Sequence, residues 1–176
     1  GRFGYSAILN LQYVYAMDRA IYLFRHLAQD DLARHWSSVR RRIAEAIVRN
    51  YWVAGSGLMA DDLERSRFSE HAQCLALLCN LLQGADRNKL IQGLLHAPAL
   101  ARTTVYFSHY LFEALYHAGA LAESDARLAF WRSLPEMGLK TVLEQPEPSR
   151  SDCHAWGAHP LFHAYASFLG ARPAEP

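Results

Sequence analysis

The sequence lacks the features that mark disulfide scaffolds, nucleic-acid-binding proteins and membrane proteins. Its three cysteines, an odd number without a C-x-x-C pair, favour free thiols in a reducing compartment, and we expect a cytoplasmic protein. Its 18 basic and 17 acidic residues give a net charge of +1, so charge offers no reason to expect a nucleic acid partner. No apolar run approaches the ~20 residues that span a bilayer, so no membrane partner is expected.

A secretory signal is also missing from residues 1–4 (GRFG), which contain no apolar core. We interpret this start as a cut within a longer chain, so the natural N-terminus is expected upstream. What the sequence does contain is apolar side chains, 51% of all residues, and this share is enough for a large core.

Strand patterns are scarce, residues 140–143 being the only short candidate, whereas helical periodicity runs through most of the chain. Helices are predicted over residues 6–28, from residue 30 or 31 to the break at Gly55, and over residues 70–82, 85–96, 106–117, 124–134 and 160–169. Ser69 is the predicted N-cap of the third helix, and Gly84 is expected to end it. Asp61 and Asp62 precede that helix; they could line the rim of a site, but a loop and capping role is the favoured interpretation.

The first helix of each predicted pair is apolar over most of its surface, and the second is amphipathic. That alternation indicates buried inner helices and half-exposed outer ones. We therefore predict an all-α fold and interpret residues 1–176 as part of one (α/α)6 toroid, an incomplete ring of about seven helices. A helical solenoid is the alternative, but the sequence shows no repeat of fixed period.

The chemistry is expected on the long irregular loop of residues 136–157, because sites concentrate on loops that a rigid frame positions. This loop carries carboxylates, a histidine and a tryptophan. Such groups suit a sugar: carboxylates for acid and base steps, polar groups for hydroxyls, and an apolar ring for stacking. A plain surface loop with an ion pair between Arg150 and Glu147 is the alternative that composition leaves open.

Four sequence blocks, in this order, resemble glycoside hydrolase family 78, the α-L-rhamnosidases. The blocks are residues 5–16 (YSAILNLQYVYA), 68–78 (FSEHAQCLALL), 106–115 (YFSHYLFEAL), and 141–144 (TVLE) followed by 151–156 (SDCHAW). The resemblance identifies residues 1–176 as the C-terminal part of a six-hairpin glycosidase catalytic domain. It implies an inverting hydrolysis that removes terminal α-L-rhamnosyl residues, with a carbohydrate as partner and no cofactor.

The same resemblance implies roles for single residues. Glu144 matches the family's T-x-x-E position and would be the general base that activates water. His154 would bind sugar hydroxyls, with Trp156 near the sugar ring, and Glu147 is the runner-up base. The family's general acid lies upstream of all four blocks, so we expect this chain alone to be inactive. Leu143 stands where many members place tryptophan, which leaves the aglycone preference open.

Two other functions stay open: a glycosidase of the same architecture acting on another deoxy- or uronic sugar, and a non-catalytic helical-repeat interaction module. A concave pocket that gathers Glu144, His154 and Trp156 would favour a glycosidase. A smooth charged face with Glu144 pointing to solvent would favour the module. Because an incomplete ring exposes inner helix faces, we also expect self-association or a non-native closure.

Four more histidines outside this loop have two interpretations each. His71 could reach a central cavity or fill a first-turn position of its helix. His109 could line the pocket as a substrate-binding residue or bond to a backbone carbonyl within the core. His159 and His163 have the i, i+4 spacing of metal ligands, but no carboxylate motif accompanies them, so no metal is predicted.

Overall fold

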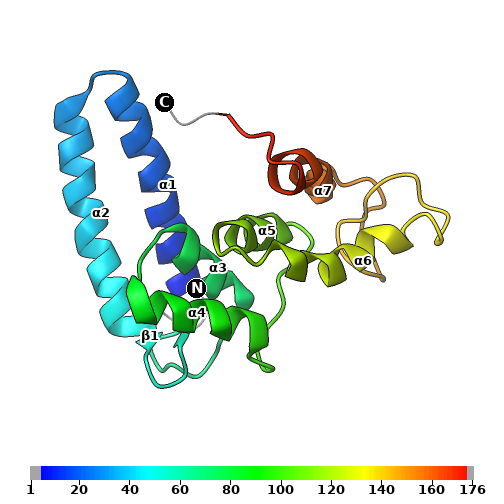
Figure 1. Cartoon of the computed structure of the whole chain (residues 1–176), viewed down its shortest axis with the longest axis horizontal. Coiled ribbons are helices and arrows are strands. Elements are labelled where there is room, and N and C mark those ends of the chain that lie inside the picture. The colour runs from blue at the N-terminus through cyan, green and yellow to red at the C-terminus, as the bar shows by residue number, and fades with distance from the viewer. Residues whose placement is uncertain (1–4, 174–176) are drawn as a thin grey trace. The chain divides into compact units, whose positions relative to one another are not determined.

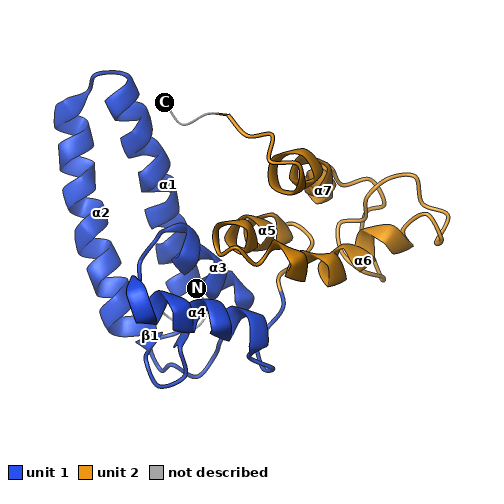
Figure 2. Cartoon of the chain, in the orientation of Figure 1, with its two compact units in different colours: residues 1–102 blue, residues 103–176 orange. Residues whose placement is uncertain are grey.

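The computed structural model describes residues 5–173, which form two compact units. Unit 1 extends to residue 102 and unit 2 begins at residue 103 (Figures 1 and 2). Within the described range the chain forms seven α-helices and two strands of two residues each, so the all-α prediction is confirmed. No helix there has the length and apolar character needed to cross a membrane. Residues 1–4, on which the interpretation of the chain's start rests, lie outside this range.

Unit 1 consists of two helical pairs. Its helices are α1 (Ala7–His26), α2 (Asp30–Tyr51), α3 (Glu70–Leu78) and α4 (Gly84–His96). α1 packs mainly against α2, and α3 contacts both α1 and α4. Leu11 of α1, Leu75 of α3 and Leu90 of α4 are all 0% exposed in the core. The Ser69 side chain accepts a hydrogen bond from the Ala72 amide, which confirms the predicted N-cap.

A short hairpin between α2 and α3 was not predicted. β1 (Trp52–Val53) pairs antiparallel with β2 (Leu58–Met59), and Gly57 in the connecting turn has a φ of +68°. α4 lies directly against this turn, since a Cβ on Gly93 would come within 2.6 Å of Leu58 Cδ2. The turn and its close neighbour therefore both depend on glycine. The predicted strand candidate, residues 140–143, forms no strand.

The third helix is shorter than predicted. α3 ends at Leu78 rather than at residue 82, because Asn80 adopts a left-handed conformation with φ of 51°. The Leu81 amide then donates to the Ala76 carbonyl, which satisfies one of the last carbonyls of the helix. Gly84 begins α4 instead of ending α3. Asparagine tolerates the left-handed region, so it can stop a helix without glycine.

Unit 2 packs short helices around α5. Its elements are α5 (Ser108–His117), the 3-10 turn η1 (Leu121–Ser124), α6 (Asp125–Ser133), the 3-10 turn η2 (Ala155–Ala158), α7 (His159–His163) and the π-helical η3 (Ala164–Phe168). α5 contacts α7 and η3, and η1 joins α5 to α6. The helix predicted over residues 160–169 is thus divided between α7 and η3. The irregular loop predicted over residues 136–157 spans residues 134–154, because residues 155–158 form η2.

Candidate functional site

The loop that carries the predicted chemistry is folded back on itself. The Glu144 amide donates to the Ser151 carbonyl at 2.9 Å, and the His154 amide donates to the Val142 carbonyl at 2.8 Å. Leu143, between these two bonds, is 0% exposed. Glu144 and His154 therefore project from two stretches that backbone hydrogen bonds and a buried side chain hold together.

A glycine fixes the neighbouring turn η2 against this loop. A Cβ on Gly157 would lie 2.5 Å from Val142 Cγ1, a separation that real side chains do not reach. The Trp131 indole also donates to the Gly157 carbonyl at 2.7 Å. Since Trp156 is the preceding residue, the close approach at Gly157 positions its ring next to the loop.

Glu144 faces a hollow of about 460 Å³. The hollow is lined by Thr104, Tyr106, Glu144, Gln145, Arg150 and Trp156. The Glu144 side chain is only 10% exposed, and the Tyr106 and Trp156 rings meet edge to face with centroids 5.7 Å apart. A carboxylate beside an aromatic wall can bind the polar edge and the apolar face of a sugar at once.

Arg150 pairs with Glu144 and not with Glu147. Its Nε donates to Glu144 Oε2 at 3.1 Å, and its Nη2 donates to Oε1. Glu147 instead accepts from the Ser149 amide at 2.7 Å. The pairing that the sequence left open is therefore corrected: the arginine holds both oxygens of the candidate base, while its own side chain is 75% exposed.

His154 packs against Trp156, which lines the hollow. The two rings lie with centroids 4.0 Å apart and a tilt of 44°. Nδ1 of His154 is buried and has no hydrogen-bond partner among the described residues. His154 does not itself line the hollow, and its buried Nδ1 is an unmatched polar atom next to Trp156.

His109 belongs to a second cluster in unit 2, with His159 and His163 of α7. Its Nδ1 lies 3.1 Å from His163 Nε2, rather than on a backbone carbonyl. His159 is the histidine that bonds to backbone, with Nε2 2.9 Å from the Val105 carbonyl. Burial lowers the pKa of His159 and of His163 to about 4, and it lowers the pKa of His109 as well. All three rings are therefore neutral at pH 7.

Glu113 and Arg172 border this cluster, and the sequence reasoning missed both. Arg172 donates to the two carboxylate oxygens of Glu113 at 2.8 and 3.1 Å. Burial opposes ionisation of Glu113, but these bonds outweigh it and hold its pKa below the ordinary value. The available signal was spacing, since Glu113 follows His109 by four residues on α5, as His163 follows His159 on α7.

Three buried or partly buried acids of unit 1 form hydrogen bonds or ion pairs within the fold. Asp62 is 2% exposed, and Arg67, with help from Ser66, holds its pKa well below the usual range. Burial raises the pKa of Asp61, which accepts from the Ser69 hydroxyl at 2.8 Å. Both contacts lie within the loop before α3, as predicted. Glu70, 0% exposed, is paired with Arg102 at 2.7 Å.

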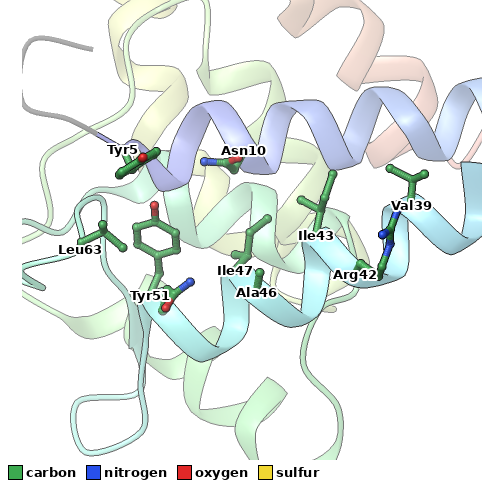
Figure 3. A pocket seen from close by; sticks show the side chains of 10 residues that line it. Tyr5, Asn10, Val39, Arg42, Ile43, Ala46, Ile47, Tyr51 and Leu63 are labelled. Carbon is green, nitrogen blue, oxygen red and sulfur yellow. The ribbon is translucent and has the colours of Figure 1, made fainter.

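Unit 1 also has a hollow of about 600 Å³ between α1 and α2 (Figure 3). Its lining is Tyr5, Asn10, Val39, Arg42, Ile43, Ala46, Ile47, Asn50, Tyr51 and Leu63. This set contains no carboxylate and no imidazole, so it offers no acid or base that works near neutral pH. His71, which is half-buried at the start of α3, is not part of this lining, and burial lowers its pKa.

The chain resembles known proteins in structure, although its sequence matches none of the family models or curated proteins. No protein-family model and no curated protein matches the chain. A rhamnosidase from Klebsiella oxytoca with rhamnose bound matches 93% of the chain with a TM-score of 0.80 at 22% identity. A GH78 family rhamnosidase of Bacillus sp. GL1 matches 94% with a TM-score of 0.84, also at 22% identity.

The chain spans only part of these neighbours, 34% of the first and 19% of the second. The likeness nevertheless extends over almost all of the chain. At this level of identity a structural match establishes fold and not chemistry. The chain therefore has the helical fold of the corresponding part of these two rhamnosidases.

Proposed function

We propose that this chain forms the base-bearing part of a glycoside hydrolase that removes terminal α-L-rhamnosyl residues with inversion. The observation that carries the proposal is the Glu144 carboxylate, only 10% exposed, in a hollow that it shares with the Tyr106 and Trp156 rings. The fold of two solved rhamnosidases, one of them with rhamnose bound, supports the choice of substrate.

In this proposal Glu144 is the general base. It takes a proton from water while the water oxygen bonds to the anomeric carbon. The bond from that carbon to the leaving oxygen breaks on the opposite face, and a general acid protonates the leaving oxygen. Inversion requires carboxyl groups about 6.5–9.5 Å apart, which leaves room for the water. We assign no residue of this chain as the acid.

Arg150 must release the base before it can act. In the free protein the guanidinium occupies both oxygens of Glu144. Its side chain is 75% exposed, so an entering substrate can reach the guanidinium and displace it from the carboxylate. Substrate entry then leaves one oxygen of Glu144 for water. Arg150 positions the carboxylate until that moment.

The sugar itself would bind on the aromatic side of the hollow. The ring of Trp156 is 47% exposed and offers an apolar face for stacking. His154 packs on that ring, and because its Nδ1 is buried, Nε2 is the nitrogen that would meet a sugar hydroxyl. His109 lies in the other cluster of unit 2, so it is not assigned to sugar binding here.

Two alternatives are ranked by the same geometry. The low exposure of Glu144 within a hollow favours a glycosidase over a helical interaction module. A glycosidase for uronic sugars is the second candidate, because Arg150 places an exposed cation at the hollow where a sugar carboxylate could pair.

Saturation-transfer NMR on the chain would separate these functions. L-rhamnose is expected to bind with a dissociation constant of about 1 mM, which corresponds to about −4 kcal/mol. D-galacturonate binding more tightly than rhamnose would transfer the proposal to uronic sugars, and no sugar signal would favour the interaction module. The chain alone should not turn over an aryl α-L-rhamnoside; clear turnover would show that it contains its own acid.

A further inference from the structure

We propose that His109, His159 and His163 form a binding site for one divalent transition-metal ion, with zinc as the expected occupant. One ring nitrogen of each histidine lies within 4.8 Å of one ring nitrogen of each of the others. The site is separate from the Glu144 hollow, whose lining includes none of the three. Its existence does not depend on the glycosidase function.

The spacing of the first two nitrogens already suits a metal. His109 Nδ1 and His163 Nε2 are 3.1 Å apart. Two zinc–nitrogen bonds of about 2.0–2.1 Å at a tetrahedral angle place their nitrogens about 3.3–3.4 Å apart. A shift of a few tenths of an ångström would therefore convert this contact into a chelating pair.

His159 supplies the observation that a hydrogen-bonded cluster leaves unexplained. Its Nε2 faces the Val105 carbonyl at 2.9 Å and must carry the proton, because a carbonyl oxygen only accepts. Its Nδ1 is then a bare lone pair, and this atom is buried without a hydrogen-bond partner among the described residues. Buried polar atoms without a partner are rare and require an explanation such as an ion.

A cluster without metal would satisfy only part of this arrangement. His109 could donate through Nδ1 to His163 Nε2, which pairs those two rings with each other. The lone pair of His159 Nδ1 would stay unmatched in that arrangement. A cation bound by all three histidines satisfies every one of these nitrogens.

The surroundings hold the rings in the orientation that a metal needs. His163 Nδ1 lies 2.9 Å from Ser167 Oγ, and Arg172 donates to the same oxygen at 2.9 Å. In the tautomer that a metal at Nε2 requires, His163 Nδ1 carries the proton and donates to this oxygen. Ser167 thereby orients His163 as the Val105 carbonyl orients His159. Outer acceptors of this kind accompany most metal-binding histidines and fix which nitrogen binds.

The donor set selects the class of ion. Three neutral imidazoles suit zinc, copper and nickel, whereas calcium and magnesium prefer oxygen ligands. The Phe112 and Trp131 rings lie 5.6 and 5.2 Å from the His159 ring and form an apolar shell around the cluster. Three protein ligands leave a fourth tetrahedral position for water.

A metal here would fasten α7 to α5. α7 has only five residues, too few for a helix that is stable by itself. Two of the ligands, His159 and His163, lie on α7, and the third lies on α5. The ion would thus bridge the end of the chain to the central helix of unit 2.

The test is zinc binding by the whole chain, prepared without a polyhistidine tag and treated with a chelator. Competition with a chromophoric chelator should show one zinc ion per chain, and zinc should raise the thermal midpoint. Calcium added in the same way should not bind. His109→Gln and His159→Gln should each weaken zinc binding by about 100-fold or more, since even the loss of an outer partner costs about 10–100-fold.

Matched variants keep the result decisive. His96→Ala removes an exposed histidine at the end of α4 and should leave zinc affinity unchanged. Ser167→Ala removes only the outer partner of His163 and should weaken binding about 10-fold. Circular dichroism establishes that each variant folds. The proposal is overturned if the folded wild type binds no zinc, or if it binds zinc no more tightly than the folded His109→Gln and His159→Gln variants.

Discussion

The two units differ in which buried polar atoms lack a hydrogen-bond partner. In unit 1 Asp62, Glu70 and Gln73 are almost fully buried, and each has hydrogen-bond partners close at hand. In unit 2 buried nitrogens of His154 and His159 have no partner among the described residues. Among the described residues of unit 1, the Trp52 indole is the one similar exception. Matched groups stabilise a fold, whereas unmatched acceptors beside a hollow or a cluster indicate a ligand.

The largest effect is expected from Glu144→Gln, which tests the candidate catalytic base in unit 2. In an active protein that includes this chain, the change should lower turnover of an aryl α-L-rhamnoside by about 10²–10⁴-fold, because an amide cannot accept the proton of water. Glu147→Gln is the matched control and should leave the rate within about twofold. If Glu147→Gln abolished activity and Glu144→Gln did not, the base would be the runner-up.

The next largest effect is expected from Gln73→Ala, which tests whether a buried, hydrogen-bonded side chain stabilises unit 1. Its side chain accepts from the Met59 amide and donates to the Met59 and Ser69 carbonyls, at 2.7, 2.7 and 2.8 Å. Losing these buried bonds should lower the free energy of unfolding by about 3 kcal/mol, as measured by urea denaturation. The exposed Gln92→Ala should change it by less than about 0.5 kcal/mol. Equal effects of the two substitutions would mean that the three buried hydrogen bonds of Gln73 do not stabilise the fold.

A smaller effect is expected from Asp62→Asn, with a definite dependence on pH. The folded pKa of Asp62 lies well below its unfolded value, so its contribution is present above about pH 4 and is lost as the pH falls toward the folded pKa. The variant should lose about 1–2 kcal/mol at pH 7 and show a flatter decline of stability in acid.

Asp86→Asn is the control for this measurement, since Asp86 lies in an exposed pair with Lys89. Its unfolding free energy should follow the wild type within about 0.5 kcal/mol at every pH. If the unfolding free energy of Asp62→Asn declined in acid as steeply as that of the wild type, the pair of Asp62 with Arg67 would not be the source of the pH dependence.

The smallest effect is expected from Trp156→Ala, which tests the proposed stacking surface for the sugar in unit 2. Loss of the stacking surface should weaken rhamnose binding by about 5-fold, or about 1 kcal/mol, in NMR titrations. Phe168→Ala removes a ring of nearly the same exposure, 46% against 47%, and should have no effect on sugar binding. A loss of affinity in both variants would place the sugar elsewhere in unit 2.

Local features of the fold were accessible from sequence. The Ser69 cap follows from a serine before an apolar run. The predicted cap of α2 at Asp30 or Asp31 is wrong, because Gln29 is the N-cap without a side-chain hydrogen bond and both aspartates lie in the first turn. The end of α3 was not accessible, because an Asn80 in the left-handed region competes with a helical pattern that continues beyond it. The hairpin at Gly57 was missed because two-residue strands are too short to show alternation.

The site divides in the same manner. Glu144 and His154 lie in the irregular loop and Trp156 in the turn η2 that follows it, so a prediction for the whole segment included all three. The sequence suggested Glu147 as a partner of Arg150, and how the loop folds makes that partner Glu144 instead. The histidine cluster joins His109 to residues fifty positions away, and only the packing of α5 against α7 brings them together.

The pairing of Arg150 with Glu144 also has an electrostatic consequence for substrate arrival. Among the residues that line the hollow these two carry the formal charges, one of each sign, so the free hollow has no net charge. A hollow of this kind exerts no long-range pull on ions and does not concentrate counter-ions. An uncharged sugar would reach it by diffusion and fit alone, at a rate that changes little with salt concentration.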